Sequence, residues 1–202
     1  MKLPPTRAPA GLTRGIAIAC AALLAMDAAP AGASDDYLDP QTGFRMSHYQ
    51  AVVPETVAGG TRITTEQAEQ IFKDRSAAFI DVSPSIGAGF DPQTGRWRLR
   101  QKHGHIPGST WLPDVGRGAP GEVLISYFAN SLEVITGGDK SRPILIYCKA
   151  DCWMGWNAVK RAAGLGYTNI YWYPDGIDGW TDWDNPVAVA DPVPVKIGEL
   201  TR

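Results

Sequence analysis

The chain has 202 residues, of which 44% are hydrophobic and 20% are charged, with 19 lysines and arginines against 21 aspartates and glutamates. This length predicts one domain of ordinary size with appendages, and the apolar content excludes intrinsic disorder for most of the chain. The balanced charge gives no electrostatic footprint for a nucleic-acid partner. The three cysteines are too few for a disulfide scaffold or a four-thiolate zinc site.

The first 33 residues have the pattern of a secretory signal peptide. Basic residues come first, then an apolar run, then small residues: Lys2, Arg7 and Arg14, residues 15–26, and Ala31-Gly32-Ala33. An apolar run of about 12 residues is too short for a membrane span, which needs ~20. We therefore expect cleavage after Ala33 and export to the periplasm. The alternative, a lipoprotein anchored at Cys20, is disfavoured because that cysteine lies inside the apolar run.

The remaining chain divides by composition into an N-terminal arm at 34–61, a domain at 62–186 and a C-terminal tail at 187–202. The sequence Asp-Pro-Gln-Thr-Gly occurs at 39–43 and again at 91–95. Because Pro and Gly are placed as in a tight turn with a left-handed glycine, we interpret these as two independent hairpin turns.

Helix and strand patterns alternate along the domain. In chain order they are a helix that starts at a capping box of Thr64 and Gln67, a strand at 77–82, a loop or hairpin at 83–105, a helix at 124–135, a strand at 143–147, a helix at 154–163 and a strand at 169–173. The continuous apolar run at 143–147 is typical of a buried parallel strand. The alternation predicts a single α/β domain with a central parallel sheet flanked by helices.

Cys148 directly follows the apolar strand and lies one short loop before a helix. In open α/β sheets this carboxyl end is where ligands bind. The N–H groups of the loop at 149–153 and the positive end of the helix would stabilise a thiolate and make Cys148 nucleophilic. The alternative is an inert buried cysteine, but the second thiol at Cys152 favours a reactive one.

Five short motifs occur in a fixed order within residues 62–186. They are Phe79-Ile80-Asp81-Val82, Gly104-His105-Ile106-Pro107-Gly108-Ser109, Ile146-Tyr147-Cys148, Leu165-Gly166-Tyr167-Thr168-Asn169-Ile170-Tyr171 and Gly176-Ile177-Asp178-Gly179-Trp180. In this order they resemble a rhodanese-like domain. The resemblance implies an α/β fold and sulfurtransferase chemistry with Cys148 as the cysteine that carries sulfur as a persulfide.

A narrower resemblance rests on the ten residues from Cys148 to Asn157 together with Trp-Tyr-Pro-Asp-Gly-Ile-Asp-Gly-Trp at 172–180. These are similar to an exported group of rhodanese-like proteins named for a cysteine–cysteine–tryptophan motif. The group is associated with PQQ-dependent alcohol catabolism. The resemblance implies a setting linked to quinoprotein alcohol oxidation.

The loop departs from the usual rhodanese pattern. Where that family has Gly and an Arg or Ser, this chain has Asp151, Cys152 and Trp153. Asp151 would repel thiosulfate and Trp153 offers no cation, while Lys149 could compensate. We assign Lys149, Asp151 and Trp153 as candidate binding residues and expect inefficient transfer of sulfur from thiosulfate to cyanide.

Two reactions of the cysteines remain open. Cys148 and Cys152 could cycle between dithiol and disulfide, or Cys148 could carry a persulfide, supplied by a small sulfur donor, that Cys152 resolves. Both assign Cys148 and Cys152 as catalytic. The alternative from another class is a non-catalytic binding or assembly module for a periplasmic quinoprotein dehydrogenase or its cytochrome c partner.

Other polar and aromatic residues are interpreted as structural. His103 and His105 flank Gly104, but the resemblance makes His105 a structural loop residue, so we expect no metal and no cofactor. By the same resemblance Asp81 would hold the active-site loop by hydrogen bonds. We expect four acids to be turn and surface residues, namely Asp175, Asp178, Asp182 and Asp184. We expect five tryptophans to pack in the core, with an exposed docking face as the alternative: Trp153, Trp156, Trp172, Trp180 and Trp183.

Overall fold

A computed structural model describes residues 35–86 and 89–196 together with Met1. The chain divides into two units, Met1–Pro30 and Ala31–Arg202, and all of the helices and strands of the described residues belong to the second. The expected signal peptide, its cleavage site after Ala33 and Cys20 lie outside the described residues.

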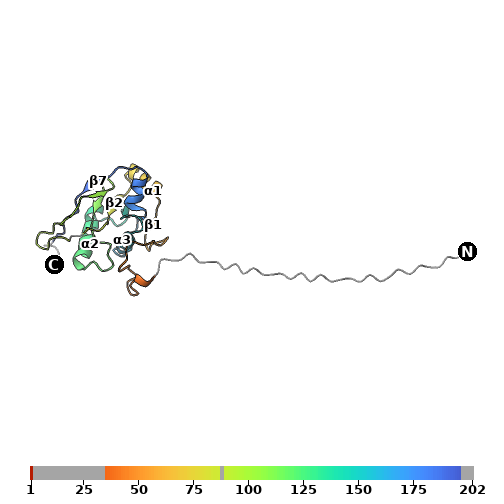
Figure 1. Cartoon of the computed structure of the whole chain (residues 1–202), viewed down its shortest axis with the longest axis horizontal. Helices are drawn as coiled ribbons and strands as arrows, with labels where there is room; N and C mark the ends of the chain where they lie inside the picture. The colour runs from red at the N-terminus through yellow and green to blue at the C-terminus, as the bar shows by residue number, and fades with distance from the viewer. Residues whose placement is uncertain (2–34, 87–88, 197–202) are drawn as a thin grey trace. The chain divides into compact units, whose positions relative to one another are not determined.

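The described chain is built of helices and strands (Figure 1). The helices are η1 (Asp35–Tyr37), α1 (Thr65–Asp74), α2 (Glu122–Thr136), α3 (Trp153–Gly164) and α4 (Gly176–Asp182). The strands are β1 (Thr61–Arg62), β2 (Ala78–Asp81), β3 (His103–His105), β4 (Thr110–Trp111), β5 (Ile144–Tyr147), β6 (Ile170–Tyr173) and β7 (Ala188–Ala190).

Five strands form a parallel sheet in the order β1-β6-β5-β2-β4. This confirms the predicted α/β fold with a central parallel sheet. All four residues of β5 are buried, as expected for a central strand covered on both faces. Cys148 follows this strand, so it lies at the carboxyl edge near the middle of the sheet.

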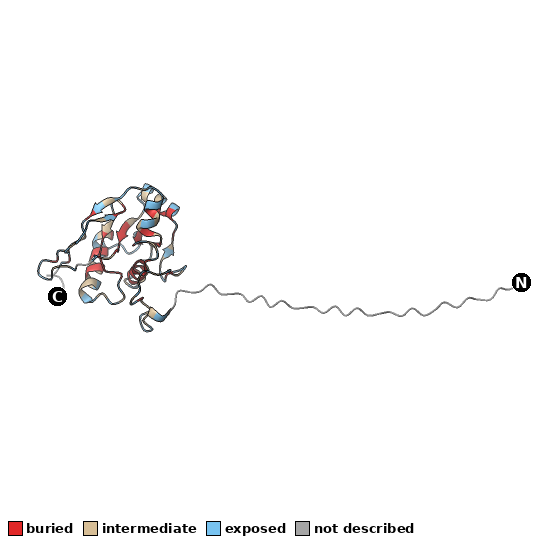
Figure 2. Ribbon diagram, viewed as in Figure 1, coloured by how far each residue is buried: buried red, intermediate tan, exposed pale blue. Residues whose placement is uncertain are grey.

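Alternating side chains of the strands enter two separate cores. Ile80, Ile144 and Ile146 pack with residues of α2 and α3 on one face of the sheet. Phe79 and Leu145 pack with residues of α1 and α4 on the other face. The buried residues therefore concentrate in the sheet and on the inner sides of the helices, as Figure 2 shows.

The local signals at Thr64 and in the two repeated turns are confirmed. The Thr64 hydroxyl accepts from the Gln67 N–H while the Gln67 side chain accepts from the Thr64 N–H, which completes the capping box. Asp39 and Asp91 each accept hydrogen bonds from the two N–H groups at positions two and three residues later. Gly43 and Gly95 close these turns with left-handed φ angles of 63° and 70°.

The segments on either side of the domain pack against it. Within the C-terminal segment, β7 pairs antiparallel with β3, and the Val193 N–H donates to the Trp111 carbonyl at 3.1 Å.

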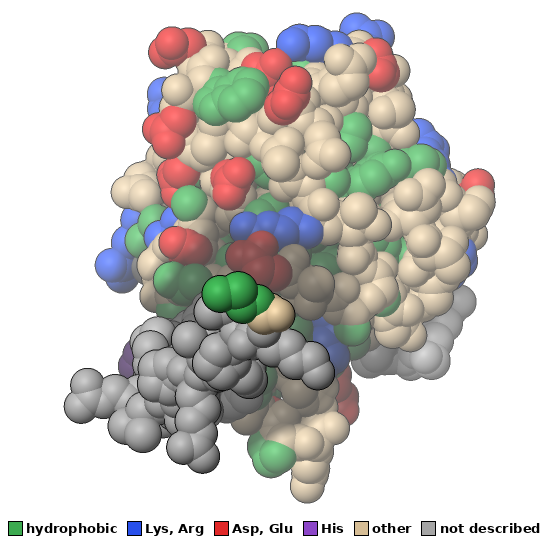
Figure 3. Space-filling view, turned by 90° about the vertical axis from the view of Figure 1, so that its right-hand side faces the viewer, with side chains coloured by type: hydrophobic (Ala, Val, Ile, Leu, Met, Phe, Trp, Pro, Cys, Tyr) green, Lys and Arg blue, Asp and Glu red, His purple; other side chains and the backbone are tan. Residues whose placement is uncertain are grey.

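Acidic and basic side chains are interspersed on the face that Figure 3 shows. Among the described residues, none of the helices has the length and apolar character needed to cross a membrane.

Candidate functional site

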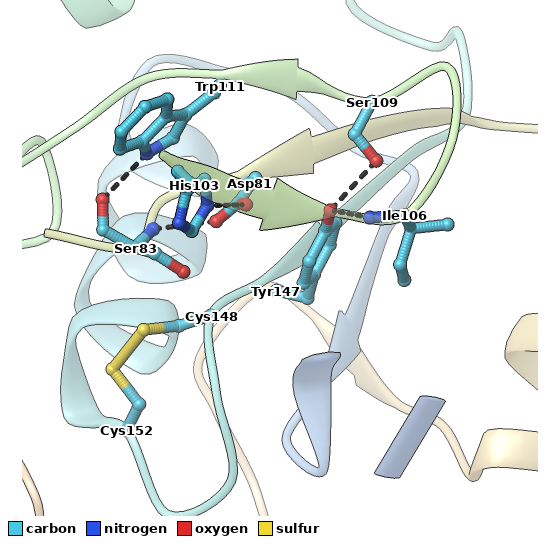
Figure 4. Close-up of polar contacts among 9 residues, drawn as sticks. All are labelled: Asp81, Ser83, His103, Ile106, Ser109, Trp111, Tyr147, Cys148 and Cys152. Carbon is cyan, nitrogen blue, oxygen red and sulfur yellow. Dashed lines mark hydrogen bonds and ion pairs between the residues drawn. A yellow bond between two sulfur atoms is a disulfide. The ribbon is translucent and has the colours of Figure 1, made fainter. Parts of the chain in front are cut away.

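Cys148 and Cys152 are joined by a disulfide (Figure 4). Cys148 directly follows the last residue of β5, and Cys152 is the residue immediately before the first turn of α3. Their Cα atoms are 6.1 Å apart, within the 4.4–6.8 Å typical of disulfides. The short loop therefore allows the bond that sequence alone left open. Both residues are buried, with exposed fractions of 2% and 5%.

We expected the backbone N–H groups of the loop at 149–153 to face the sulfur, but two of them donate to other parts of the protein. The Ala150 N–H donates to the Asp178 carboxylate at 2.9 Å. At the start of α3, the Trp153 N–H donates to the Tyr49 carbonyl at 2.8 Å. Two N–H groups that we expected to face the sulfur are thus bonded to acceptors of the protein itself.

The three candidate binding residues of the loop have different surroundings. Lys149 and Asp151 are exposed, and within the described residues neither side chain makes a hydrogen bond or an ion pair. Asp151 has a left-handed φ of 51°. Trp153 is 1% exposed, and its indole N–H donates to the Val52 carbonyl at 3.1 Å. Trp153 therefore packs in the core, while Lys149 and Asp151 can meet an approaching molecule.

A segment of the N-terminal arm runs beside the disulfide loop. Gln50 forms an antiparallel bridge with Cys152. The Gln50 side-chain amide donates to the Ala150 carbonyl at 2.6 Å, and the Ala51 N–H donates to the Asp151 carbonyl at 3.0 Å. The arm thus adds backbone and side-chain bonds to a loop a hundred residues away in sequence.

One face of α3 holds the arm in place. The residues of this face are Trp153, Trp156, Asn157 and Lys160, spaced as neighbours on a helix surface. The Trp156 indole N–H donates to the Thr56 carbonyl at 2.9 Å, and the Lys160 ammonium donates to the carbonyls of Thr42 and Gly43, each at 2.9 Å. This role was not predicted from the sequence, although the helical spacing of these side chains with polar ends is visible there.

A buried arginine completes the contact between arm and helix. Arg45 is 2% exposed, and its guanidinium lies over the rings of Tyr37 and Trp153, 4.6 and 4.7 Å from the ring centroids. Such stacking on aromatic faces compensates part of the cost of removing the cation from water. Further along α3, Arg161 donates to the carbonyls of Val115, Arg117 and Gly118, and burial lowers its pKa to about 10.

The start of α4 packs directly on the loop. The Ile177 N–H donates to the Cys148 carbonyl at 2.9 Å. Gly176 has a left-handed φ of 55°, and a Cβ atom at this position would overlap the Cys148 carbonyl. Asp178 was expected to be only a surface acid. It is exposed, but it also binds the loop through Ala150.

The expectation that Asp81 holds the cysteine loop is wrong. Its buried carboxylate accepts from the Ser83 N–H at 2.8 Å and pairs with His103 Nε2 at 2.6 Å (Figure 4). The His103 ring stacks on Trp111 with 4.0 Å between centroids. Asp81 therefore binds the segment that follows β2 and not the loop with the cysteines, because the chain after β2 returns past the end of that strand.

Neighbouring polar groups at this edge are also paired. The Tyr147 hydroxyl accepts from the Ile106 N–H at 3.0 Å and donates to the Ser109 hydroxyl at 2.9 Å. Burial raises the pKa of Tyr147 well above its ordinary value. His105 is buried and its Nδ1 atom has no hydrogen-bond partner among the described residues. The described part of the chain contains no cluster of three His, Cys, Asp or Glu side chains suited to a metal.

The tryptophans separate into buried and exposed ones. Trp153, Trp172 and Trp180 are almost fully buried, as expected for core residues. Trp156 is half-buried on the arm side of α3. The expectation of core packing is wrong for Trp183, which is 53% exposed because it follows the last residue of the short helix α4.

The model of the rhodanese-like domain family matches residues 64–182. Several solved structures are similar. The rhodanese-like domain of the Alr3790 protein from Anabaena is 18% identical, with 63% of this chain and 77% of that chain covered and a TM-score of 0.43. Thiosulfate sulfurtransferase from Pseudomonas aeruginosa is 15% identical, covering 66% and 21%, with a TM-score of 0.41. The polysulfide-sulfur transferase homodimer from Wolinella succinogenes is 16% identical, covering 65% and 80%, with a TM-score of 0.38. Among curated proteins, none matches the chain.

Proposed function

The chain belongs to the rhodanese-like domain family, and on that premise we propose that it is a sulfur-handling thiol protein whose Cys148 and Cys152 work as a redox pair. The observation that carries this proposal is the disulfide between them at the carboxyl end of the central strand. A second cysteine within bonding distance gives Cys148 an internal partner that can complete a sulfur-transfer step.

The proposed cycle begins with the reduced pair. The Cys148 thiolate attacks the terminal sulfur of a small persulfide donor in its neutral, protonated form (RSSH), so that Cys148 gains that sulfur and its proton as a persulfide and the donor leaves as a thiolate. The Cys152 thiolate then attacks the Cys148 Sγ atom, the disulfide forms and hydrosulfide leaves. The transferred sulfur is reduced to sulfide and the two thiols are oxidised. A dithiol reductant restores the pair by exchange.

The charges around the loop support a donor other than thiosulfate. Asp151 is exposed beside Cys152, and the Asp178 carboxylate is bonded to the loop. Lys149 is the cation of the same loop, and it is exposed. These surroundings favour the redox cycle over transfer of sulfur from an oxyanion.

We further propose that the protein acts in the periplasm, in a pathway linked to PQQ-dependent alcohol oxidation. The support is the signal-like N-terminal sequence and the resemblance of the residues from Cys148 to Asn157 to the cysteine–cysteine–tryptophan group. The location is tested by measuring the intact mass of the protein recovered from the periplasm. Cleavage after Ala33 predicts the mass of the chain that begins at Ser34.

Single-turnover reaction with a persulfide tests the cycle. The reduced protein is mixed with a small persulfide, and sulfide release and intact mass are followed. The wild type is expected to release an equimolar amount of sulfide and to lose about 2 Da on oxidation. Cys152→Ser is expected to retain the sulfur as a gain of about 32 Da that reductant removes. Cys148→Ser is expected to show neither change.

The opposite results have a defined meaning. If both thiols of the reduced protein react only after denaturation, the cysteines are inert and the binding or assembly module becomes the better explanation. If Cys152→Ser releases sulfide as the wild type does, Cys152 is not the resolving thiol.

A further inference from the structure

The Asp178 carboxylate is fixed against the loop that carries the two cysteines. Its Oδ2 atom accepts from the Ala150 N–H at 2.9 Å. One residue earlier, the Ile177 N–H donates to the Cys148 carbonyl at 2.9 Å. These two bonds run in opposite directions between the same two segments, so they hold the first turn of α4 against the loop. Asp178 is exposed, and its charge therefore faces molecules that approach the loop.

Free N–H groups in this kind of loop would attract an anion. A strand end followed by a helix N-terminus presents backbone donors and a positive partial charge. In this protein the Ala150 N–H is bonded to a carboxylate and the Trp153 N–H to the Tyr49 carbonyl. In the first of these contacts, a donor that could bind an anion is occupied by a carboxylate, which itself carries a full negative charge.

The other charges of the loop do not reverse this effect. Asp151 adds a second exposed carboxylate one residue before Cys152, and Lys149 adds one exposed cation directly after Cys148. The loop therefore carries Lys149 and Asp151 and binds the carboxylate of Asp178, so that among these three side chains two are negative and one is positive.

We infer that Asp178 is a specificity-determining residue that makes Cys148 react with uncharged or cationic sulfur compounds in preference to anionic ones. This inference rests on the proposed function, in which Cys148 is a reactive thiol. The physical basis is Coulomb repulsion between the Asp178 carboxylate and an anion that approaches the Cys148 sulfur. For an exposed charge in salt solution, we expect an effect of about threefold in rate.

A matched pair of alkylating reagents measures this preference directly. Iodoacetamide is neutral and iodoacetate is anionic, and both form a thioether with the Cys148 thiolate and release iodide. Because both need the same thiolate, the ratio of their rates cancels any change in the pKa of the thiol. All variants carry Cys152→Ser, so that one thiol of the mature chain is followed, and the reductant is removed before the reaction.

We expect the ratio of the iodoacetamide rate to the iodoacetate rate to be higher in the folded protein than in the same chain denatured in urea. Asp178→Asn should lower the ratio about threefold, because asparagine keeps an oxygen that accepts from Ala150 but carries no charge. Asp182→Asn is the control. It removes an exposed carboxylate one turn further along the same helix. Within the described residues, this carboxylate makes no hydrogen bond to the loop. Adding 1 M salt should reduce the difference between Asp178→Asn and its parent.

Three results would contradict the inference. One is a folded ratio equal to the denatured ratio. Another is an equal ratio in Asp178→Asn and its parent, and the third is an equal effect of Asp182→Asn. Failure of the proposed function has a separate signature, because a folded protein that reacts with neither reagent would have an inert Cys148, and both proposals would then fail.

Discussion

The side-chain amide of Asn157 binds both backbone groups of Arg45. The Arg45 N–H donates to Asn157 Oδ1 at 3.0 Å, and Asn157 Nδ2 donates to the Arg45 carbonyl at 2.8 Å. The same Nδ2 atom donates to the Gly116 carbonyl at 2.9 Å. Asn157 is fully buried. One helix residue therefore pairs with the arm in the way that a neighbouring strand would.

Asn157→Ala should lower the free energy of unfolding by about 3 kcal/mol, because it leaves buried backbone groups of Arg45 and Gly116 without partners. Urea denaturation followed by tryptophan fluorescence measures the loss. The control is Asn130→Ala on α2, a half-buried helix residue whose side chain makes no hydrogen bond within the described residues. It should change the free energy by about 0.5 kcal/mol or less. Equal losses in the two variants would contradict a clamping role for Asn157.

The main elements of the fold could be predicted because their signals are local. The apolar run at 143–147 and the helical pattern at 154–163 match β5 and α3 within a residue or two at each end. The two-residue strands β1 and β4 were missed, since two residues carry no pattern and only pairing with a neighbour defines them. The pairing of β3 with β7 was also missed, because it joins segments some 85 residues apart and no local pattern signals it.

In the candidate site too, local features could be predicted from the sequence, whereas contacts between distant segments could not. Cys148 and Cys152 were visible because their positions after a strand and before a helix are local features. The bond from Ala150 to Asp178 and the bridge from Gln50 to Cys152 depend on how distant segments pack. An exposed acid in a turn-rich stretch looks the same in sequence whether it binds a loop or only water, so Asp178 gave no distinguishing signal.

Reduction of the disulfide should lower the free energy of unfolding by about 2 kcal/mol, the entropy effect expected for a closed loop of about five residues. Urea denaturation with and without a phosphine reductant measures the difference. Cys152→Ser is the control, because its unfolding should not respond to the reductant. An unchanged midpoint for the wild type would show that the bond between Cys148 and Cys152 contributes nothing to stability.

Acidification should destabilise the protein through His105. Burial lowers the pKa of this histidine below its ordinary 6.5, with repulsion from His103 acting in the same direction and the Asp81 charge acting against it. The unfolded chain therefore binds a proton as the pH falls through about 6.5, while the folded chain stays neutral at this position until lower pH. The stabilising contribution is fully present above this pH and is lost below it.

Urea denaturation at several pH values between about 7.5 and 5.5 tests this expectation. His105→Gln should flatten the fall in the free energy of unfolding over this window, because the titrating group is gone. His48→Asn removes an exposed histidine from the arm and should keep the wild-type fall. A His105→Gln curve parallel to the wild type would assign the acid sensitivity to other groups.

Gly176→Ala should destabilise the protein and displace the cysteine loop. The glycine has a left-handed φ, and an added Cβ atom would overlap the Cys148 carbonyl, so α4 and the loop must separate. Gly138→Ala provides the control, because Gly138 has a φ of 82° but no atom within contact distance of an added Cβ. Both variants lose about 1 kcal/mol from the backbone conformation, and Gly176→Ala should lose a further ~2 kcal/mol from overpacking.

Urea denaturation gives the two free energies, and a count of free thiols after air oxidation reports on the loop. The Ile177 N–H bond to the Cys148 carbonyl requires the close approach that Gly176 allows, so Gly176→Ala should also slow formation of the disulfide. Gly138→Ala should oxidise like the wild type, because it lies at the C-terminal end of α2, away from the cysteines in the chain. If the two variants lose equal stability and oxidise at equal rates, contact between α4 and the loop is not what holds Cys148 in its bonding position.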